Sequence, residues 1–247
     1  MIKFFQKIRQ RLLSENKLSK YLLYAIGEII LVVIGILIAL QINNWNDKRK
    51  FQKEKTHYIE ALINDYVQDT INFTQTINAH NLEAKTLKVL NTRVYQPNAN
   101  LDTIVAIAKD FNGVKFQEVS FFTNTFDSME SSGKLELFEN DIKERIFSHN
   151  NTQKKISNYQ YVANNVIIEK ITLYTNSYKF ANPSNQTESY LTNLTWTIEN
   201  EREFVMLFTE LIGLAHWNIE NVVLNNLNQL LNETRAMITL LKEEQKI

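Results

Sequence analysis

Side chains able to perform acid–base or metal chemistry are few in this 247-residue sequence, and they lie far apart. The four histidines are His57, His80, His149 and His216. None is followed at i+3 or i+4 by a second histidine, the arrangement that a metal site on one helix uses. The spacing therefore favours surface or interfacial polar roles for all four.

Asp65 and Asp69 are separated by one helical turn, which would place two carboxylates on the same face. Neighbouring Thr, Gln and Asn residues favour a solvated face over a cation site. The sequence has no Cys, phosphate-binding Gly-rich loop, nucleophile elbow or dinucleotide fingerprint. We therefore predict no catalytic residue, metal ligand or cofactor, and expect a protein that is not an enzyme. An enzyme would need a pocket of convergent polar groups that no motif reveals.

Glu28 is the one acid in a long apolar stretch. From Tyr21 to Ile42 the only strongly polar side chains are Glu28 and Gln41. At the helical rise these 22 residues extend about 33 Å, which matches the hydrocarbon core of a bilayer. The stretch predicts an uncleaved transmembrane helix over residues 21–43. A buried core helix and a cleaved signal peptide are the alternatives, but Ala39–Gln41 fits a cleavage site poorly.

One stripe of this predicted span combines the acid with small residues. At 100° per residue, Tyr24, Glu28, Gly35 and Ala39 lie on the same side. Gly35 and Ala39 form a small-xxx-small pair that lets another helix approach closely. An ionised carboxylate in lipid is costly, so Glu28 should be neutral, paired or facing water. We predict an oligomer or partner interface here; a proton relay and an acid tolerated near the headgroups are the alternatives.

Basic and aromatic residues flank the span. Residues 1–20 predict an amphipathic helix along the membrane surface, with Lys3, Lys7 and Arg11 opposite an apolar side. Its simpler alternative is a positive flank that orients the span. Trp45 is expected at headgroup depth on the other side. Lys and Arg number six before the span and five just after it, so charge barely sets the orientation.

Long domains translocate largely regardless of charge, which favours a cytoplasmic N-terminus. In a Gram-negative cell the protein would then be a single-pass protein of the inner membrane with a periplasmic domain.

The remaining sequence predicts an all-α fold, because only five Gly and two Pro interrupt it. Apolar residues at helical spacing continue the span into a stalk over residues 44–94, followed by a short helical cap over 95–139. Two further long helices are expected over 140–180 and 198–244, so that residues 44–247 form an elongated three- to four-helix bundle. Gly133 is expected at a helix C-terminus, and Asn140 or Asp141 at the N-cap of the next helix.

Aromatic residues gather in and after the predicted cap. They could line a pocket, although such residues more often belong to a core. They are Phe121, Phe122, Phe126, Phe138, Tyr159 and Tyr161.

Three quoted stretches resemble a known family. They are "KIRQRLLSENK", "KYLLYAIGEIILVVIGILIALQINNWND" and "ESSGKLELFENDIKERI". The sequence is similar to a family of unknown function that is widespread in Bacteroidota genomes. The resemblance implies a single-span membrane protein with a helical C-terminal domain, and it implies no activity. Asp47 stands where the family pattern suggests Glu.

Two classes of function remain. The net charge of zero removes the basic character of nucleic-acid binders, so the expected partners are the lipid bilayer and either a second copy or another membrane protein. We favour a non-enzymatic, membrane-anchored interaction protein that self-associates. The alternative is an extracytoplasmic sensor or an accessory subunit of a transport, channel or motor complex that uses Glu28.

Overall fold

The computed structural model describes residues 18–111, 113–116, 119–178 and 198–246. Every regular element in these residues is a helix, which confirms the predicted all-α fold. The chain divides into two compact units between His57 and Tyr58. The second unit contains the helical bundle.

The first described helix, α2 (Leu18–Val94), is 77 residues long. It continues without a break through the residues predicted as span and stalk and ends at Val94, three residues before Pro97. In the second unit α2 turns its predicted apolar stripe into the core. The buried members of this stripe include Ile59, Leu62, Tyr66, Phe73, Ile77, Leu87 and Val94.

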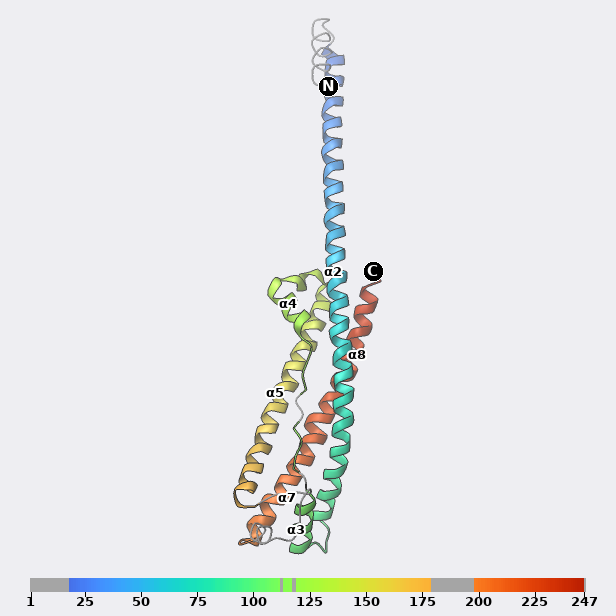
Figure 1. The fold of residues 1–247 in the computed structure, drawn as a ribbon. Coiled ribbons are helices and arrows are strands. Elements are labelled where there is room, and N and C mark those ends of the chain that lie inside the picture. The colour runs from blue at the N-terminus through green and yellow to red at the C-terminus, as the bar shows by residue number, and fades with distance from the viewer. Residues whose placement is uncertain (1–17, 112, 117–118, 179–197, 247) are drawn as a thin grey trace. The chain divides into compact units, whose positions relative to one another are not determined.

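Two more long helical segments lie beside residues 58–94 of α2 (Figure 1). One is α5 (Asn140–Ser177). The other is continuous and consists of α7 (Glu201–Trp217), the π-helical turn η2 (Asn218–Leu224) and α8 (Asn225–Glu244). Asn200 caps α7, because its side chain accepts a hydrogen bond from the backbone N–H of Glu203.

The start of α5 differs from the prediction. Its N-cap is Glu139, which makes no capping hydrogen bond through its side chain, and Asn140 is already helical. The Asn140 or Asp141 cap was therefore wrong. Asp141 instead lies in the first turn, where a carboxylate interacts favourably with the helix dipole.

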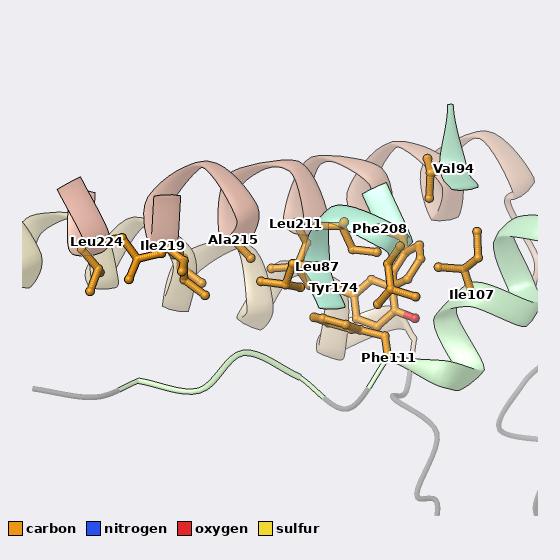
Figure 2. Packing of buried hydrophobic residues seen from close by; sticks show 14 of the residues in the cluster. Leu87, Val94, Ile107, Phe111, Tyr174, Phe208, Leu211, Ala215, Ile219 and Leu224 are labelled. Atoms are coloured by element: carbon orange, nitrogen blue, oxygen red, sulfur yellow. The ribbon is translucent and has the colours of Figure 1, made fainter. Parts of the chain in front are cut away.

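The core consists of two apolar clusters. The large cluster joins residues 73–94 of α2 to α3, to residues 156–178 and to residues 204–231. Figure 2 shows part of it, running from Val94 and Ile107 past Tyr174 to Leu224. The small cluster joins residues 59–66 of α2 to residues 126–146 and to Met237 and Leu241.

The two short α-helices of the predicted cap belong to different clusters. Helix α3 (Leu101–Asp110) buries Ile104 and Ile107 in the large cluster, whereas α4 (Asn124–Ser132) buries Phe126 and Met129 in the small one. Figure 1 shows them at opposite ends of the bundle. Gly133 ends α4 at φ 69° in the left-handed region, which confirms its predicted role, and a 3₁₀ turn, η1 (Lys134–Leu137), follows.

After α3 the chain returns along α2 as a strap, defined as residues 113–116 and 119–125, the last two of which begin α4. Three carboxylates of α2 accept backbone N–H groups from it: Glu83 from Lys115 at 2.8 Å, Asp69 from Phe122 at 2.9 Å and Asp65 from Thr125 at 3.1 Å. The order of these contacts makes the strap antiparallel to α2. Because Thr125 lies in the first turn of α4, Asp65 also satisfies one of the N–H groups that a helix leaves unpaired.

Candidate functional site

Five buried polar residues form a layer between the two apolar clusters. Asp69 comes from α2, His149, Asn150 and Gln153 come from α5, and Thr234 comes from α8. Each is at most 4% exposed. The polar layer therefore sits where three long helices meet, at a level where the rest of the core is apolar.

Asp69 is the anionic member of the polar layer. One carboxylate oxygen accepts the backbone N–H of Phe122, and the other accepts the side-chain amide of Gln153 at 2.8 Å. Burial raises the pKa of Asp69 to about 6; the two hydrogen bonds lower it, and the nearby Asp65 raises it further. Asp69 thus links the strap, α2 and α5 through one side chain.

His149 is the basic member. Its Nε2 lies 3.3 Å from Thr234 Oγ1, and its ring meets the Tyr66 ring edge-on, with centroids 4.8 Å apart. The Thr234 hydroxyl donates to the carbonyl of Leu230 at 2.8 Å, so its oxygen is left to accept from His149. We therefore assign the neutral Nε2–H tautomer. Burial lowers the pKa of His149 to about 4, which keeps the ring neutral at pH 7.

The polar layer corrects two expectations from the sequence. Asp69 is fully buried rather than part of a solvated face, and His149 is buried rather than superficial. His80 is buried as well and faces Glu83, with 3.6 Å between Nδ1 and Oε2.

A signal for the polar layer was present in the sequence. Asp69 lies three residues after Tyr66 and four before Phe73, so it continues the buried stripe of α2. His149 follows Ile146 at i+3, and Thr234 follows Leu231 at i+3. Polar residues in register with an apolar stripe on three helices predict a shared buried layer.

Chemically, the polar layer can hold a proton and fix how the helices pack. The hydrogen bonds of Asp69 and of His149 Nε2 form only when the three helices are in register, whereas His149 Nδ1 and the Asn150 amide are buried without a partner among the described residues. Within the described residues no three His, Cys, Asp or Glu side chains group as metal ligands. The aromatic residues for which core and pocket were both considered are divided: Phe126 and Phe138 are buried in the small cluster, and Phe122 and Tyr161 are exposed.

The predicted membrane segment is a second candidate site. Glu28 is half-buried, while Gly35 and Ala39 are exposed, and a Cβ added to Gly35 would meet no atom within 4 Å. Trp45 is 65% exposed, and the Arg49 guanidinium lies 6.0 Å from its ring centroid. Lys3, Lys7, Arg11 and the side chain of Tyr24 lie outside the part that the structure describes. The interface predicted for this stripe stays a prediction.

Comparison with known proteins adds a family. No curated protein and no solved structure matches the chain. One family model matches residues 28–170, a range that includes most of the predicted span, the strap and the part of α5 that contributes to the polar layer. The chain therefore belongs to the family of unknown function DUF6090.

Proposed function

We propose that the protein is a single-pass, membrane-anchored, non-enzymatic interaction protein whose helical domain binds a second copy or another membrane protein. The observation that carries this proposal is a run of exposed apolar side chains on α2. Fourteen large apolar residues between Leu22 and Ile42 are each at least 46% exposed. Among the described residues, α2 is the one helix that is long and apolar enough to cross a membrane.

The exposure favours lipid over the interior of a soluble protein as the surroundings of this helix. A core helix of a soluble protein has a similar composition but is mostly buried. The most apolar 18-residue segment of α2, by contrast, is 0% buried within the chain. A continuous apolar surface of this size exceeds the few hundred Å² that soluble monomers expose. Lipid contact removes that surface from water on every side at once.

The compartment is part of the same proposal. We place the span in the inner membrane of a Gram-negative bacterium, as in Bacteroidota, with the short N-terminus in the cytoplasm and the bundle in the periplasm. Support comes from the length of the chain after the span, because long domains translocate largely regardless of flanking charge.

Membrane extraction of the full chain tests the anchor. The parent should stay in the pellet after a sodium carbonate wash and enter solution only with detergent. Val33→Arg with Leu37→Arg should release the chain, because two arginines near the centre of a span raise the free energy of insertion by about 6 kcal/mol. The matched control is Leu82→Arg with Val89→Arg, two exposed apolar positions of α2 within the bundle. Parent protein recovered in the supernatant without detergent would contradict the anchor.

Crosslinking in membranes tests self-association through the stripe of Glu28, Gly35 and Ala39. Gly35→Leu should reduce the dimer yield several-fold, because the added side chain blocks close helix approach. Gly27→Leu, about 100° away from Glu28 on the helix, is the control and should leave the yield unchanged. Equal yields from the parent and Gly35→Leu would remove this interface. Glu28→Gln keeps hydrogen bonding without titration, so assembly should survive it.

A further inference from the structure

A cluster of positively charged side chains follows the apolar run of α2. We define the basic collar as Lys48, Arg49, Lys50, Lys53 and Lys55. Residues 47–55 include only two acids, Asp47 and Glu54, so five cations against two acids give this segment an excess of three positive charges in a chain whose net charge is zero. Every member of the collar except Lys55 is exposed, and all of them belong to the first compact unit.

The basic collar extends around more than half of the helix. At 100° per residue its five cations spread over about 220° of the circumference. Asp47 and Glu54 are a heptad apart and share the remaining side, where Asp47 also accepts a hydrogen bond from the side-chain amide of Asn43 at 3.1 Å. A single protein surface or a bound ligand would contact one side of a helix. Charges placed around the helix fit a medium that surrounds it, such as the headgroup layer of a bilayer.

The basic collar begins just beyond the end of the apolar run. Ile42, the last large apolar residue of that run, is 62% exposed, and Lys48 follows it about 9 Å further along the helix axis. The headgroup layer extends about 5–7 Å beyond the hydrocarbon core. Because lysine and arginine stems lie along apolar surface and keep the charged head in water, Lys48 can reach back to the phosphate groups. Lys53 stays within about 10 Å of that layer, the distance over which a charged surface acts at 0.1 M salt.

Trp45 marks the headgroup level between the apolar run and the basic collar. Its indole is 65% exposed, and tryptophan side chains prefer the membrane–water interface. The Arg49 guanidinium lies 6.0 Å from the centroid of this ring. A cation at this distance from an aromatic face is attracted to it, so one member of the collar is held at the depth of the indole.

The positive-inside rule does not explain the basic collar. That rule describes an excess of Lys and Arg in cytoplasmic loops, whereas the collar lies on the translocated side in the topology that we propose. Phosphate groups of anionic lipids offer its charges a partner, because each Lys or Arg near an anionic membrane surface strengthens binding by about 1 kcal/mol, or roughly fivefold. A zwitterionic lipid carries its own cation beside the phosphate, which weakens the attraction.

From these observations we propose that the basic collar binds the headgroups of anionic phospholipids and enriches these lipids around the end of the span. The inference rests on the proposed membrane anchor, because the collar meets headgroups only if the apolar run lies in lipid. It adds a preference for lipid charge, which apolar contact alone does not produce. The two proposals therefore make different predictions for the same membrane sample.

Quenching of Trp45 fluorescence by brominated lipids tests the collar. The full chain carries Trp196→Phe and Trp217→Phe, which leaves Trp45 as its one tryptophan. It is reconstituted into vesicles of three parts phosphatidylcholine and one part phosphatidylglycerol. The same amount of brominated acyl chain is placed on phosphatidylglycerol in one sample and on phosphatidylcholine in the other. We expect a preference of roughly fivefold or more for phosphatidylglycerol around Trp45. In 1 M KCl, where the Debye length is about 3 Å, the preference should fall toward equality.

Variants show whether the collar causes the preference. Lys48→Gln with Lys50→Gln and Lys53→Gln should reduce it to less than about twofold, and Arg49 stays in place beside the fluorescent indole. Lys→Arg at the same three positions should keep the preference, because headgroup binding depends on charge. The matched control neutralises three exposed lysines of the second unit and should also keep it. These substitutions are Lys85→Gln, Lys88→Gln and Lys242→Gln.

The outcomes separate this proposal from the anchor. Equal quenching of the parent by the two brominated lipids would overturn the collar and leave the anchor intact. An equal loss of preference in the collar variant and in the matched control would also overturn it, because charge anywhere on the chain would then suffice. If neither lipid quenched Trp45, the indole would not lie at a bilayer, and both proposals would fall.

Discussion

At the scale of single residues, Asp69 and His149 have pKa shifts of opposite sign for the same reason. Burial disfavours the charged form of both, so it raises the pKa of the acid and lowers that of the base. The two residues therefore oppose each other when the pH changes between about 4 and 6. In the parent protein the two contributions to unfolding free energy change in opposite directions with pH and largely cancel. Single substitutions should separate them.

Replacing His149 should remove an acid-sensitive loss of stability. The folded pKa lies below the ordinary 6.5, so the contribution of the neutral ring is complete above pH 6.5 and is lost as the pH falls toward 4. Between pH 7 and 4 the parent should lose about 3 kcal/mol more unfolding free energy than His149→Gln. Urea unfolding at several pH values measures the difference. A difference that is constant with pH would contradict a buried, neutral His149.

Replacing Asp69 should give the opposite pH dependence. Its folded pKa is raised to about 6 from 3.8, so its contribution is complete below pH 3.8 and is lost as the pH rises through 6. The stability of Asp69→Asn relative to the parent should therefore increase by about 3 kcal/mol between pH 4 and 7. The same unfolding series measures it, and His149→Gln serves as the control with the opposite sign.

The sequence predicted these residues less well than it predicted the core. Polar neighbours predict a solvated face for Asp69, and the spacing of the histidines predicts a surface or interfacial position for His149. Both predictions follow the general tendency of polar residues to be exposed. Their burial depends on a tertiary fact, that three helices place polar residues at one level. Apolar positions such as Phe73 and Phe208 needed no such fact, because burial follows directly from the helical period.

At the scale of elements, the spacing of apolar residues explains the π-helical turn. From Leu211 the core positions recur every four residues as far as Leu227, passing through Ala215, Ile219 and Val223. In an α-helix four such steps would rotate the last residue about 160° away from the first. The wider turn η2 absorbs much of this rotation, so α7 and α8 present one continuous face to the core. We predicted the helix and missed the turn, although this run of four-residue steps was its signal.

Shortening η2 by one residue should be far more damaging than changing an exposed side chain in it. Deleting Glu220 would rotate the following residues by about 100° relative to α7 and move Leu227 and Leu230 away from the core. Each displaced leucine costs about 2 kcal/mol or more, so we expect a loss of several kcal/mol in unfolding free energy. Glu220→Ala keeps the length and should change stability by less than about 1 kcal/mol. Similar stability for the two variants would refute this explanation of the π turn.

At the scale of the whole molecule, the sequence predicted the helices better than their arrangement. The long helices and the two short ones follow from the helical period, Gly133 and Pro97. The positions of α3 and α4 at opposite ends of the bundle depend on the strap, and backbone hydrogen bonds to distant carboxylates leave no local pattern in a sequence.

Cysteine labelling can establish the orientation of the chain, because the natural sequence has no Cys. Asn64→Cys and Glu169→Cys place single thiols at exposed positions of α2 and α5. Both should react with a membrane-impermeant maleimide in intact spheroplasts if the bundle is periplasmic. Ser14→Cys, on the other side of the span, should react only after lysis. The reverse pattern would invert the proposed topology.

The hydrogen bonds that hold the strap have a consequence for how this family can vary. Glu83, Asp69 and Asp65 accept main-chain N–H groups, which every amino acid except proline supplies. Exchanges at Lys115 or Thr125 should therefore be tolerated during evolution, whereas loss of an acceptor on α2 should not. We expect homologous chains to keep the three carboxylates, whereas the residues whose N–H groups donate to them should vary. Proline should be absent from these donor positions, because it has no backbone N–H.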